Sequence, residues 1–313
     1  MKINNILFTG RLIKELDSLL DSSEALKGRD LRFIPESVIS REDLEWADAY
    51  VAFQPTVNFQ FGNVKWVHSL GAGVDRYMAL GNWPEDVLLT RTITSFGQKI
   101  GEYTLSYMLK DLQHHDTFRD QQGRGEWKML APRALKEVKV VIFGTGEIGQ
   151  EVARILAYFG VKVYGVSRSG TEKSHFCKVM PLGGIEDSCI GEADYVINTL
   201  PLTVETECLF DDGFFGKLNQ AVFLNVGRGG TVDHDALLAA LDSRNVKAAV
   251  LDVFEEEPLP VGSRLWSHRG VTITPHISAI TTPEEAVACF LETLEGVESG
   301  RELRNTVNVG RGY

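Results

Sequence analysis

The strongest constraint on the fold is the alternation of apolar, strand-like segments with helical ones in the second half of the chain. KEVKVVIF (136–143) has the valine-rich pattern of a buried strand and leads through GTGEIG into QEVARILAYFG. In that last segment Val152, Ile155, Leu156 and Phe159 recur at helical spacing, and a glycine follows them as a stop. Further strand candidates are VKVYGVS, ADYVINTLP, QAVFLNVG, VKAAVLDVF and VTITPH, and DHDALLAALDSRN between them is typical of a helix. This alternation predicts a parallel, doubly wound sheet.

The first hundred residues repeat the pattern more weakly, with strand candidates INNILFTG, LRFIPES, ADAYVAFQ and VKWVHSLG. We expect a long helix over residues 101–127, and the stretch TTPEEAVACFLETLEGVESG is expected to form a closing helix against the first domain. A chain of 313 residues exceeds what one hydrophobic core usually serves. We therefore expect two α/β domains, one formed by residues 1–100 and 281–313 and the other by residues 101–280.

Charge and composition limit the partners of this chain. A net charge of −11 argues against nucleic acid and anionic membranes as partners, because phosphate-rich surfaces need a compensating basic patch. The sequence has no run of about 18 or more apolar residues, and its first residues, MKINNILFTGRL, do not resemble a signal peptide. We therefore expect a cytoplasmic protein that does not bind a membrane.

Four cysteines, Cys177, Cys189, Cys208 and Cys289, are far apart and form no CxxC pair. This spacing favours reduced, mostly buried thiols over a disulfide framework or a zinc site. No metal site is expected.

The segment GTGEIG lies between a predicted strand and a predicted helix. Gly144 permits a tight turn, Gly146 permits the close approach of a pyrophosphate, and Gly149 permits close packing of helix on strand. The helix N-terminus then faces the phosphates. Such turns also occur for purely structural reasons, but with both flanks in place we predict nucleotide binding by the whole loop, which also contains Thr145, Glu147 and Ile148.

The second strand of this domain, in VYGVSRSG (163–170), ends without the acidic residue that usually binds the ribose hydroxyls of NAD. Ser167, Arg168 and Ser169 stand there instead. A guanidinium can pair with a 2′-phosphate, which a carboxylate would repel. The sequence therefore favours NADP(H) over NAD(H), and the alternative is that Arg168 is a solvated surface residue.

A second group of chemically active residues follows other predicted strands. NVGRGGTVD contains Arg228, LDVFEEEPLP contains Asp252 and Glu257, and TPHISAI contains His276. Because the carboxyl ends of parallel strands line the ligand crevice of an open sheet, these groups are expected to converge near a bound nicotinamide ring.

These motifs together resemble the D-isomer-specific 2-hydroxyacid dehydrogenases over essentially the whole chain. The matching segments are SLGAGVD (69–75), GTGEIG, LPLTVET (200–206), LNVGRGG (224–230), LDVFEEEPLP (251–260) and ITPHISA (273–279). The SRS residues, the stretch AITTPEEAV and the final Arg311, Gly312 and Tyr313 resemble in particular the glyoxylate/hydroxypyruvate reductase A group of that family.

The resemblance implies two Rossmann-like or flavodoxin-like domains with the active-site cleft between them. It also implies NADPH-dependent reduction of a small 2-oxo acid, such as glyoxylate or hydroxypyruvate, to the D-2-hydroxy acid. His276 would donate the proton, and Glu257 would keep it charged, because a neighbouring carboxylate stabilises an imidazolium ion. Arg228 would bind the substrate carboxylate and carbonyl oxygen, and the backbone N–H groups near Ala72 and Gly73 would complete the carboxylate site.

Further contacts follow from the same resemblance. Trp266 is expected to close one wall of the substrate pocket, with core filling as its alternative role. The remaining cofactor contacts are expected at Leu200, Pro201, Val226, Gly227, Asp252 and Ser278. Pro201 could simply end a strand, and Asp252 could be a structural hydrogen-bond acceptor. The resemblance also implies a homodimer joined through the cofactor domains, in which the helix over 101–127 could take part.

Three alternatives remain at this point. Phe53 and Gln54 stand where the reductase group tends to carry tryptophan and histidine, so a bulkier 2-oxo acid could be the substrate. A dehydrogenase for formate or for a phosphorylated hydroxy acid is a second alternative, and Glu257 disfavours formate because the formate enzymes carry glutamine there. The third is a regulatory protein that senses NADP(H) without turning over a substrate.

Overall fold

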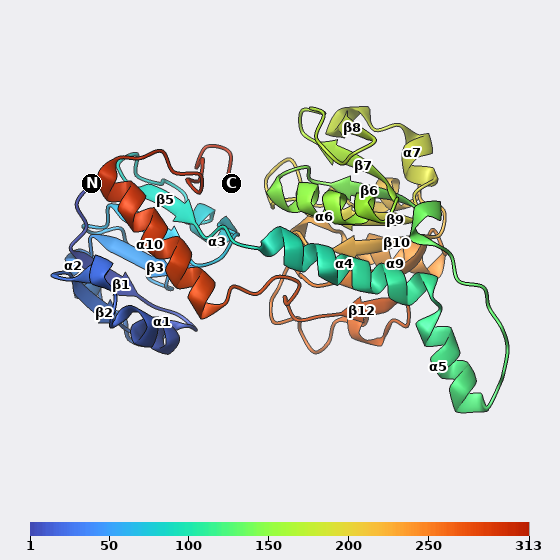
Figure 1. The fold of residues 1–313 in the computed structure, drawn as a ribbon, viewed down its shortest axis with the longest axis horizontal. Coiled ribbons are helices and arrows are strands. Elements are labelled where there is room, and N and C mark those ends of the chain that lie inside the picture. The colour runs from blue at the N-terminus through green and yellow to red at the C-terminus, as the bar shows by residue number, and fades with distance from the viewer. Residues whose placement is uncertain (313) are drawn as a thin grey trace. The chain divides into compact units, whose positions relative to one another are not determined.

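The computed structural model describes residues 1–312, so Tyr313 of the expected terminal RGY motif lies outside the described residues. The chain divides into two compact units, residues 1–94 with 281–313 and residues 95–280. Each unit has its own parallel sheet with helices on both faces, which confirms the predicted α/β class with doubly wound sheets (Figure 1). Residues 95–100, which were expected in the first domain, lie in the second unit.

The first unit contains a five-stranded sheet in the order β2-β1-β3-β4-β5, and all its neighbouring strands are parallel. This order is that of flavodoxin-like folds. The strands are β1 (Asn5–Phe8), β2 (Asp30–Phe33), β3 (Ala49–Ala52), β4 (Trp66–Ser69) and β5 (Leu88–Arg91). Strand β5 is absent from the sequence-based expectation, because its segment, LLTR, has only two adjacent apolar residues, which give neither an alternation nor an apolar run.

The helices of the first unit are α1 (Ile13–Leu20), α2 (Arg41–Trp46), α3 (Asp75–Met78) and α10 (Pro283–Ser299). Apolar residues of α1 and α10 form one core cluster with every second residue of the strands, which face one side of the sheet. Apolar residues of α2 and α3 form a second cluster with the strand residues that face the other side. The expected closing helix is therefore present as α10. It begins with a capping box between Thr282 and Glu285 and ends at Gly300, which has a φ of +71°.

The second unit contains a seven-stranded parallel sheet in the order β12-β11-β10-β9-β6-β7-β8. Numbered within the unit, this is the Rossmann order 3-2-1-4-5-6 with a seventh strand added. The strands are β6 (Lys139–Phe143), β7 (Lys162–Ser167), β8 (Lys178–Pro181), β9 (Tyr195–Asn198), β10 (Ala221–Asn225), β11 (Val246–Leu251) and β12 (Val271–Ile273). All but β8 lie within segments that the apolar pattern identified.

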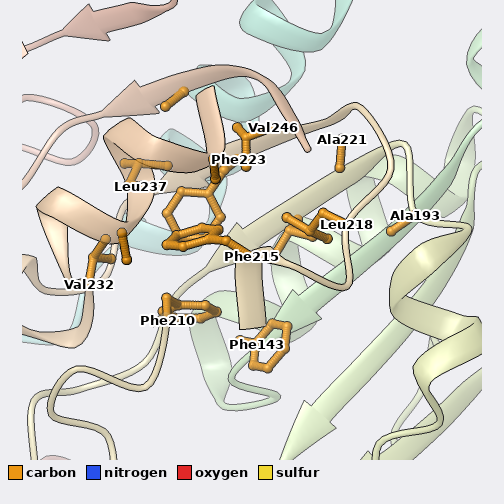
Figure 2. Packing of buried hydrophobic residues seen from close by; sticks show 14 of the residues in the cluster. Phe143, Ala193, Phe210, Phe215, Leu218, Ala221, Phe223, Val232, Leu237 and Val246 are labelled. Carbon is orange, nitrogen blue, oxygen red and sulfur yellow. The ribbon is translucent and has the colours of Figure 1, made fainter. Parts of the chain in front are cut away.

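Helices cover both faces of this sheet. Alternate residues of β6 belong to different core clusters: Val140 and Ile142 pack with α4 (Phe96–Leu112) and α6 (Glu147–Tyr158). Val141 and Phe143 pack with α8 (Asp212–Phe215), α9 (His234–Asp242) and α7 (Asp187–Gly191). Figure 2 shows the aromatic centre of this second cluster, where Phe143, Phe210, Phe215 and Phe223 lie close together. Burial on both faces explains why the strands of this unit are continuously apolar.

The prediction of one long helix over residues 101–127 is wrong in two respects. The helix begins earlier, at Phe96, and it is interrupted after Leu112, so that α5 (His115–Arg124) is a separate helix. The interruption lies at His114, whose φ of +56° is incompatible with a continuing right-handed helix. Figure 1 shows α5 projecting away from the sheet of its own unit, and Trp127 and Met129 beyond it are almost fully exposed.

The four cysteines are free, but only Cys189 is buried, and Cys177 and Cys208 are exposed, so the expectation of mostly buried thiols is wrong. Within residues 1–312, no group of three or more His, Cys, Asp or Glu side chains is arranged to hold a metal ion. None of the described helices is long and apolar enough to cross a membrane.

Candidate active site

The glycine loop lies where the strand order of the seven-stranded sheet reverses, between β6 and β9. Gly144 has a φ of +97°, and a Cβ atom there would lie 2.5 Å from Thr199 Oγ1. A Cβ atom at Gly149 would overlap the carbonyl oxygen of Gly144. At Gly146, in contrast, no heavy atom from another part of the chain lies within 4 Å of the Cβ position. Two glycines therefore permit close packing, and the third leaves open space beside the helix N-terminus, as a pyrophosphate would require.

The loop after β7 contains the three residues expected to select the cofactor. Ser167 Oγ accepts a hydrogen bond from the N–H of Gly170 at 3.1 Å, which holds a tight turn. Ser169 Oγ lies 2.8 Å from the hydroxyl of Thr171. The exposed guanidinium of Arg168 lies 3.3 Å from Glu205, in the loop after β9. The end of β7 lacks an acidic residue, but the Glu205 carboxylate, from the loop after β9, lies beside the same turn.

Buried amides hold the next two strand ends together. Asn198, at the end of β9, donates hydrogen bonds from Nδ2 to Asn225 Oδ1 at 2.9 Å and to Thr231 Oγ1 at 2.7 Å. Asn198 Oδ1 also accepts from the N–H of Leu200 at 3.0 Å. The Nδ2 of Asn225 and the hydroxyl of Thr231 both donate to the carbonyl oxygen of Arg228. This network fixes the backbone from which the Arg228 side chain extends.

The other predicted cofactor contacts at these strand ends are tightly packed. Val226 is buried and donates its N–H to the carbonyl of Asn198 at 3.1 Å. A Cβ atom at Gly227 would lie 2.6 Å from the carbonyl oxygen of Leu200, so the two loops approach closely there. The carbonyl of Pro201 accepts a hydrogen bond from the hydroxyl of Thr206 at 2.7 Å.

Asp252 is fully buried at the end of β11 and organises the turn that carries His276. Its Oδ1 accepts hydrogen bonds from the N–H of Ile277 at 2.8 Å and the hydroxyl of Thr274 at 2.6 Å. Its Oδ2 accepts from the N–H of Ser278 at 2.9 Å, and its backbone carbonyl accepts from the N–H of His276 at 2.9 Å. The structural role that the sequence left open for Asp252 is therefore present in the fold.

This turn also has a support on α4. The hydroxyl of Tyr103 lies 2.7 Å from Thr274 Oγ1, which in turn donates to Asp252. Burial raises the pKa of Tyr103 well above its ordinary value, so the phenol stays protonated. His276 itself has a φ of +54°, a conformation that costs energy for a residue other than glycine and has to be imposed by its surroundings.

The side chains of His276 and Glu257 form a pair. His276 Nδ1 lies 2.8 Å from Glu257 Oε2, and Glu257 Oε1 accepts the N–H of Phe254 at 2.9 Å. Burial raises the pKa of Glu257, but the hydrogen bonds from His276 and Phe254 and the charge of Arg228 outweigh it, so the net pKa is lowered. Because an ionised carboxylate only accepts hydrogen bonds, Nδ1 is the donor, and Nε2 is the ring nitrogen left for a substrate.

In the first unit, the loop after β4 contains the other expected substrate contacts. Ser69 Oγ donates to the carbonyls of Gly71 and Gly73, both at 3.2 Å, and Arg91 donates to the carbonyl of Ala72 at 3.3 Å. Within the described part of the chain, the N–H groups of Ala72 and Gly73 have no protein acceptor. Neighbouring N–H groups without a protein acceptor can bind an anion such as a carboxylate.

Two further aromatic side chains, those of Trp266 and His68, differ in their exposure. Trp266 is about half exposed, on a short 3-10 helix, and its indole N–H donates to the carbonyl of Pro260 at 2.9 Å, so it does not fill a core. His68 is fully buried between the hydroxyls of Thr90 and Thr92. Burial lowers the pKa of His68 to about 3, so it is a neutral core residue.

The structure thus brings Arg228, Glu257 and His276 together, and it places the glycine loop and the Ser167–Ser169 turn at the carboxyl edge of the same sheet. Sequence reasoning missed the residues that support them, which are Asn198, Asn225, Thr231, Thr274, Tyr103 and Glu205. Three of them, Asn198, Asn225 and Thr274, are polar residues at or next to strand ends, a signal that becomes informative only when the strand order is known.

Comparison with known proteins found a matching family model, a similar sequence and similar solved structures. The family model for the NAD-binding domain of D-isomer-specific 2-hydroxyacid dehydrogenases matches residues 105–278. A relative from Streptomyces coelicolor, described as an uncharacterized protein in the mprR 3′ region, is 36% identical over 250 residues, which cover 80% of this chain and 90% of the relative.

Two solved structures are similar over the full length of both chains. One is a D-isomer-specific 2-hydroxyacid dehydrogenase from Xanthobacter autotrophicus in complex with NADPH and MES, with 32% identity and a TM-score of 0.88. The other is the NADPH-dependent glyoxylate/hydroxypyruvate reductase from Sinorhizobium meliloti in complex with NADP and sulfate, with 30% identity and a TM-score of 0.87.

Proposed function

The chain belongs to the D-isomer-specific 2-hydroxyacid dehydrogenases, and on that premise we propose that it reduces a small 2-oxo acid, such as glyoxylate or hydroxypyruvate, with NADPH. The observation that carries this proposal is the ion pair of His276 with Glu257, with the charge of Arg228 acting on the same carboxylate. A proton donor, a carboxylate hydrogen-bonded to it and a cation for an acidic substrate are the groups this reaction needs.

In the proposed reaction, the reduced nicotinamide supplies a hydride to the carbonyl carbon of the 2-oxo acid. His276 donates its Nε2 proton to the carbonyl oxygen, so that a neutral hydroxyl forms and the imidazole becomes neutral. Glu257 stays ionised throughout, because its lowered pKa keeps it charged to lower pH than an ordinary glutamate. Arg228 binds the substrate carboxylate and the carbonyl oxygen, and the N–H groups of Ala72 and Gly73 bind the carboxylate.

The cofactor proposal is NADP(H) in preference to NAD(H). The open space at Gly146 and the uncapped start of α6 fit a pyrophosphate, and Arg168, Ser167 and Ser169 offer a cation and two hydroxyls to a 2′-phosphate. The two similar solved structures were obtained with NADPH and NADP, which supports this choice. Leu200, Pro201, Val226, Gly227, Asp252 and Ser278 remain proposed contacts of the cofactor, and Trp266 remains a proposed contact of the substrate.

We also propose that the protein is a homodimer. Large apolar side chains on the segment after α5, Trp127 and Met129, are almost fully exposed, and Phe118 on α5 is partly exposed. Exposed apolar side chains gathered on a projecting segment are typical of an interface. A second copy is the occupant we infer, because α5 leaves the body of its unit, so an equivalent arm could reach its counterpart.

The reaction is tested by following NADPH and NADH oxidation with glyoxylate, hydroxypyruvate, pyruvate and phenylpyruvate. We expect NADPH to be oxidised faster than NADH, with the two small acids as the best substrates. His276→Ala should lower kcat by about 10² to 10⁴, because a positioned proton donor is lost. The control is His268→Ala, since His268 pairs with the exposed carboxylate of Asp242 at the end of α9. Near-normal turnover in His276→Ala would contradict the assigned proton donor.

A further inference from the structure

An exposed arginine lies at the carboxyl edge of the five-stranded sheet. Arg11 follows β1, and the strand order of this sheet reverses between β1 and β3. In open α/β sheets, ligands bind outside the carboxyl ends of the strands at such a reversal. In the part of the chain that the structure describes, the Arg11 guanidinium has no ion pair and no hydrogen bond. Its charge is therefore available to an anion.

The guanidinium is held in place by an aromatic ring. Arg11 Cζ lies 4.1 Å from the centroid of the Phe53 ring, at the end of β3, and Phe53 packs against the core of this unit. Such stacking uses the face of the guanidinium and leaves its N–H groups, which point outward in its plane, free to bind a ligand. Arg11 is therefore oriented without being neutralised.

The same ring borders the loop proposed to bind the substrate carboxylate. A Cβ atom at Gly71 would lie 3.5 Å from Phe53 Cδ1, so the ring edge is in contact distance of the loop while its face carries Arg11. Ala72 and Gly73, with their free N–H groups, follow directly. Two groups that attract anions thus border one phenyl ring, one at its face and one at its edge, in a chain whose net charge is −11.

We propose that Arg11, oriented by Phe53, is an anion subsite for a second acidic group of the substrate. The substrate class is then a 2-oxo acid with a distal carboxylate, in addition to the small monoacids. This inference rests on the proposed function, since it assumes that the 2-oxo carboxylate binds at Ala72 and Gly73. Phe53 and Arg11 together form the wall that determines which substrates are preferred.

The test compares two substrates that have the same five-carbon chain. One is 2-oxoglutarate, and the other is 2-oxopentanoate, which lacks the distal carboxylate. With NADPH as donor, we expect the wild type to have the higher kcat/KM for 2-oxoglutarate. Arg11→Gln should lower the ratio of the two kcat/KM values by about tenfold or more, the loss typical of a charge-assisted hydrogen bond. Phe53→Leu should lower the same ratio, because the platform under the guanidinium is lost.

Lys14→Gln is the matched control, because it removes the same charge from an exposed position on α1 nearby in sequence. It should leave the ratio within about twofold, since exposed charges are screened by salt. An unchanged ratio in Arg11→Gln, or a wild-type preference for 2-oxopentanoate, would overturn the subsite.

Glyoxylate is measured in parallel to separate the two proposals. Turnover of glyoxylate without discrimination between the five-carbon acids would remove the subsite and leave the proposed function intact. If no acid is turned over, the proposed function fails, and calorimetric titration of 2-oxoglutarate into wild-type and Arg11→Gln protein decides the subsite. Equal affinity of the two proteins, or no binding to either, would then overturn it.

Discussion

At the scale of single residues, the pairing of Arg168 with Glu205 bears most directly on cofactor choice. The carboxylate lies 3.3 Å from the guanidinium that we propose for the 2′-phosphate, so a phosphate there has to compete with it. Both side chains are more than half exposed, and exposed ion pairs contribute little to stability, so the competition is weak. Glu205 thus provides, from another loop, the kind of carboxylate that the β7 strand end lacks.

We predict that Glu205→Gln tightens NADPH binding by up to about fivefold, because an ion pair of at most about 1 kcal/mol no longer competes with the phosphate. NADH binding should not tighten, since NADH has no 2′-phosphate. The measurement is the dissociation constant of each cofactor by fluorescence titration. Glu207→Gln, an exposed carboxylate of the same loop, is the control. Equal tightening of NADPH and NADH would contradict the competition.

At the scale of elements, the His276 turn depends on contacts between α4, β11 and the residues after β12. The Tyr103 hydroxyl is hydrogen-bonded to Thr274, and Thr274 donates a hydrogen bond to Asp252. Asp252 in turn accepts hydrogen bonds from the N–H groups of the two residues that follow His276. These hydrogen bonds connect α4 to the turn that orients the proposed proton donor, so a displacement of α4 would displace the turn.

We predict that Thr274→Val lowers the free energy of unfolding by about 1–3 kcal/mol, because a buried carboxylate loses a donor. It should also lower kcat, because the His276 turn loosens, while the NADPH dissociation constant changes little. Thermal unfolding and steady-state kinetics check both parts. Thr272→Val, on β12 itself, is the control, since the Thr272 side chain makes no hydrogen bond within residues 1–312. A loss of stability without any loss of kcat would leave Thr274 a purely structural residue.

At the scale of the whole molecule, the segment beyond α5 carries two large apolar side chains, Trp127 and Met129, that are almost fully exposed. Replacing Trp127 and Met129 together by serine should convert the proposed dimer into a monomer, because the apolar area that the second copy covers is lost. Light scattering coupled to size exclusion measures the mass. Val261→Ser, which changes an equally exposed apolar residue elsewhere in the same unit, should leave the dimer intact. A wild-type protein with the mass of one chain would refute the dimer directly.

The sequence by itself determined the family, the α/β class and the position of most strands. Continuous apolar runs such as KVVIF and AVFLN are local signals, because a strand buried on both faces needs apolar residues at every position. The glycine spacing at Gly144, Gly146 and Gly149 is equally local, because the three glycines lie within six consecutive residues between a strand and a helix. Arg228, Glu257 and His276 were identified because they follow predicted strands, within motifs that resemble a known family, and the fold places them together.

The tertiary structure decided what depends on pairs of residues that are distant in sequence. The carboxylate of Glu205 meets Arg168, and Asp252 holds the His276 turn, only because parallel strands bring their ends to one edge of the sheet. The interruption of the helix at His114 depends on one backbone angle, which the spacing of apolar residues does not predict. Strands β5 (LLTR) and β8 (KVMP) each contain only two adjacent apolar residues, which give neither an alternation nor an apolar run, and they become strands because a neighbour offers them hydrogen bonds.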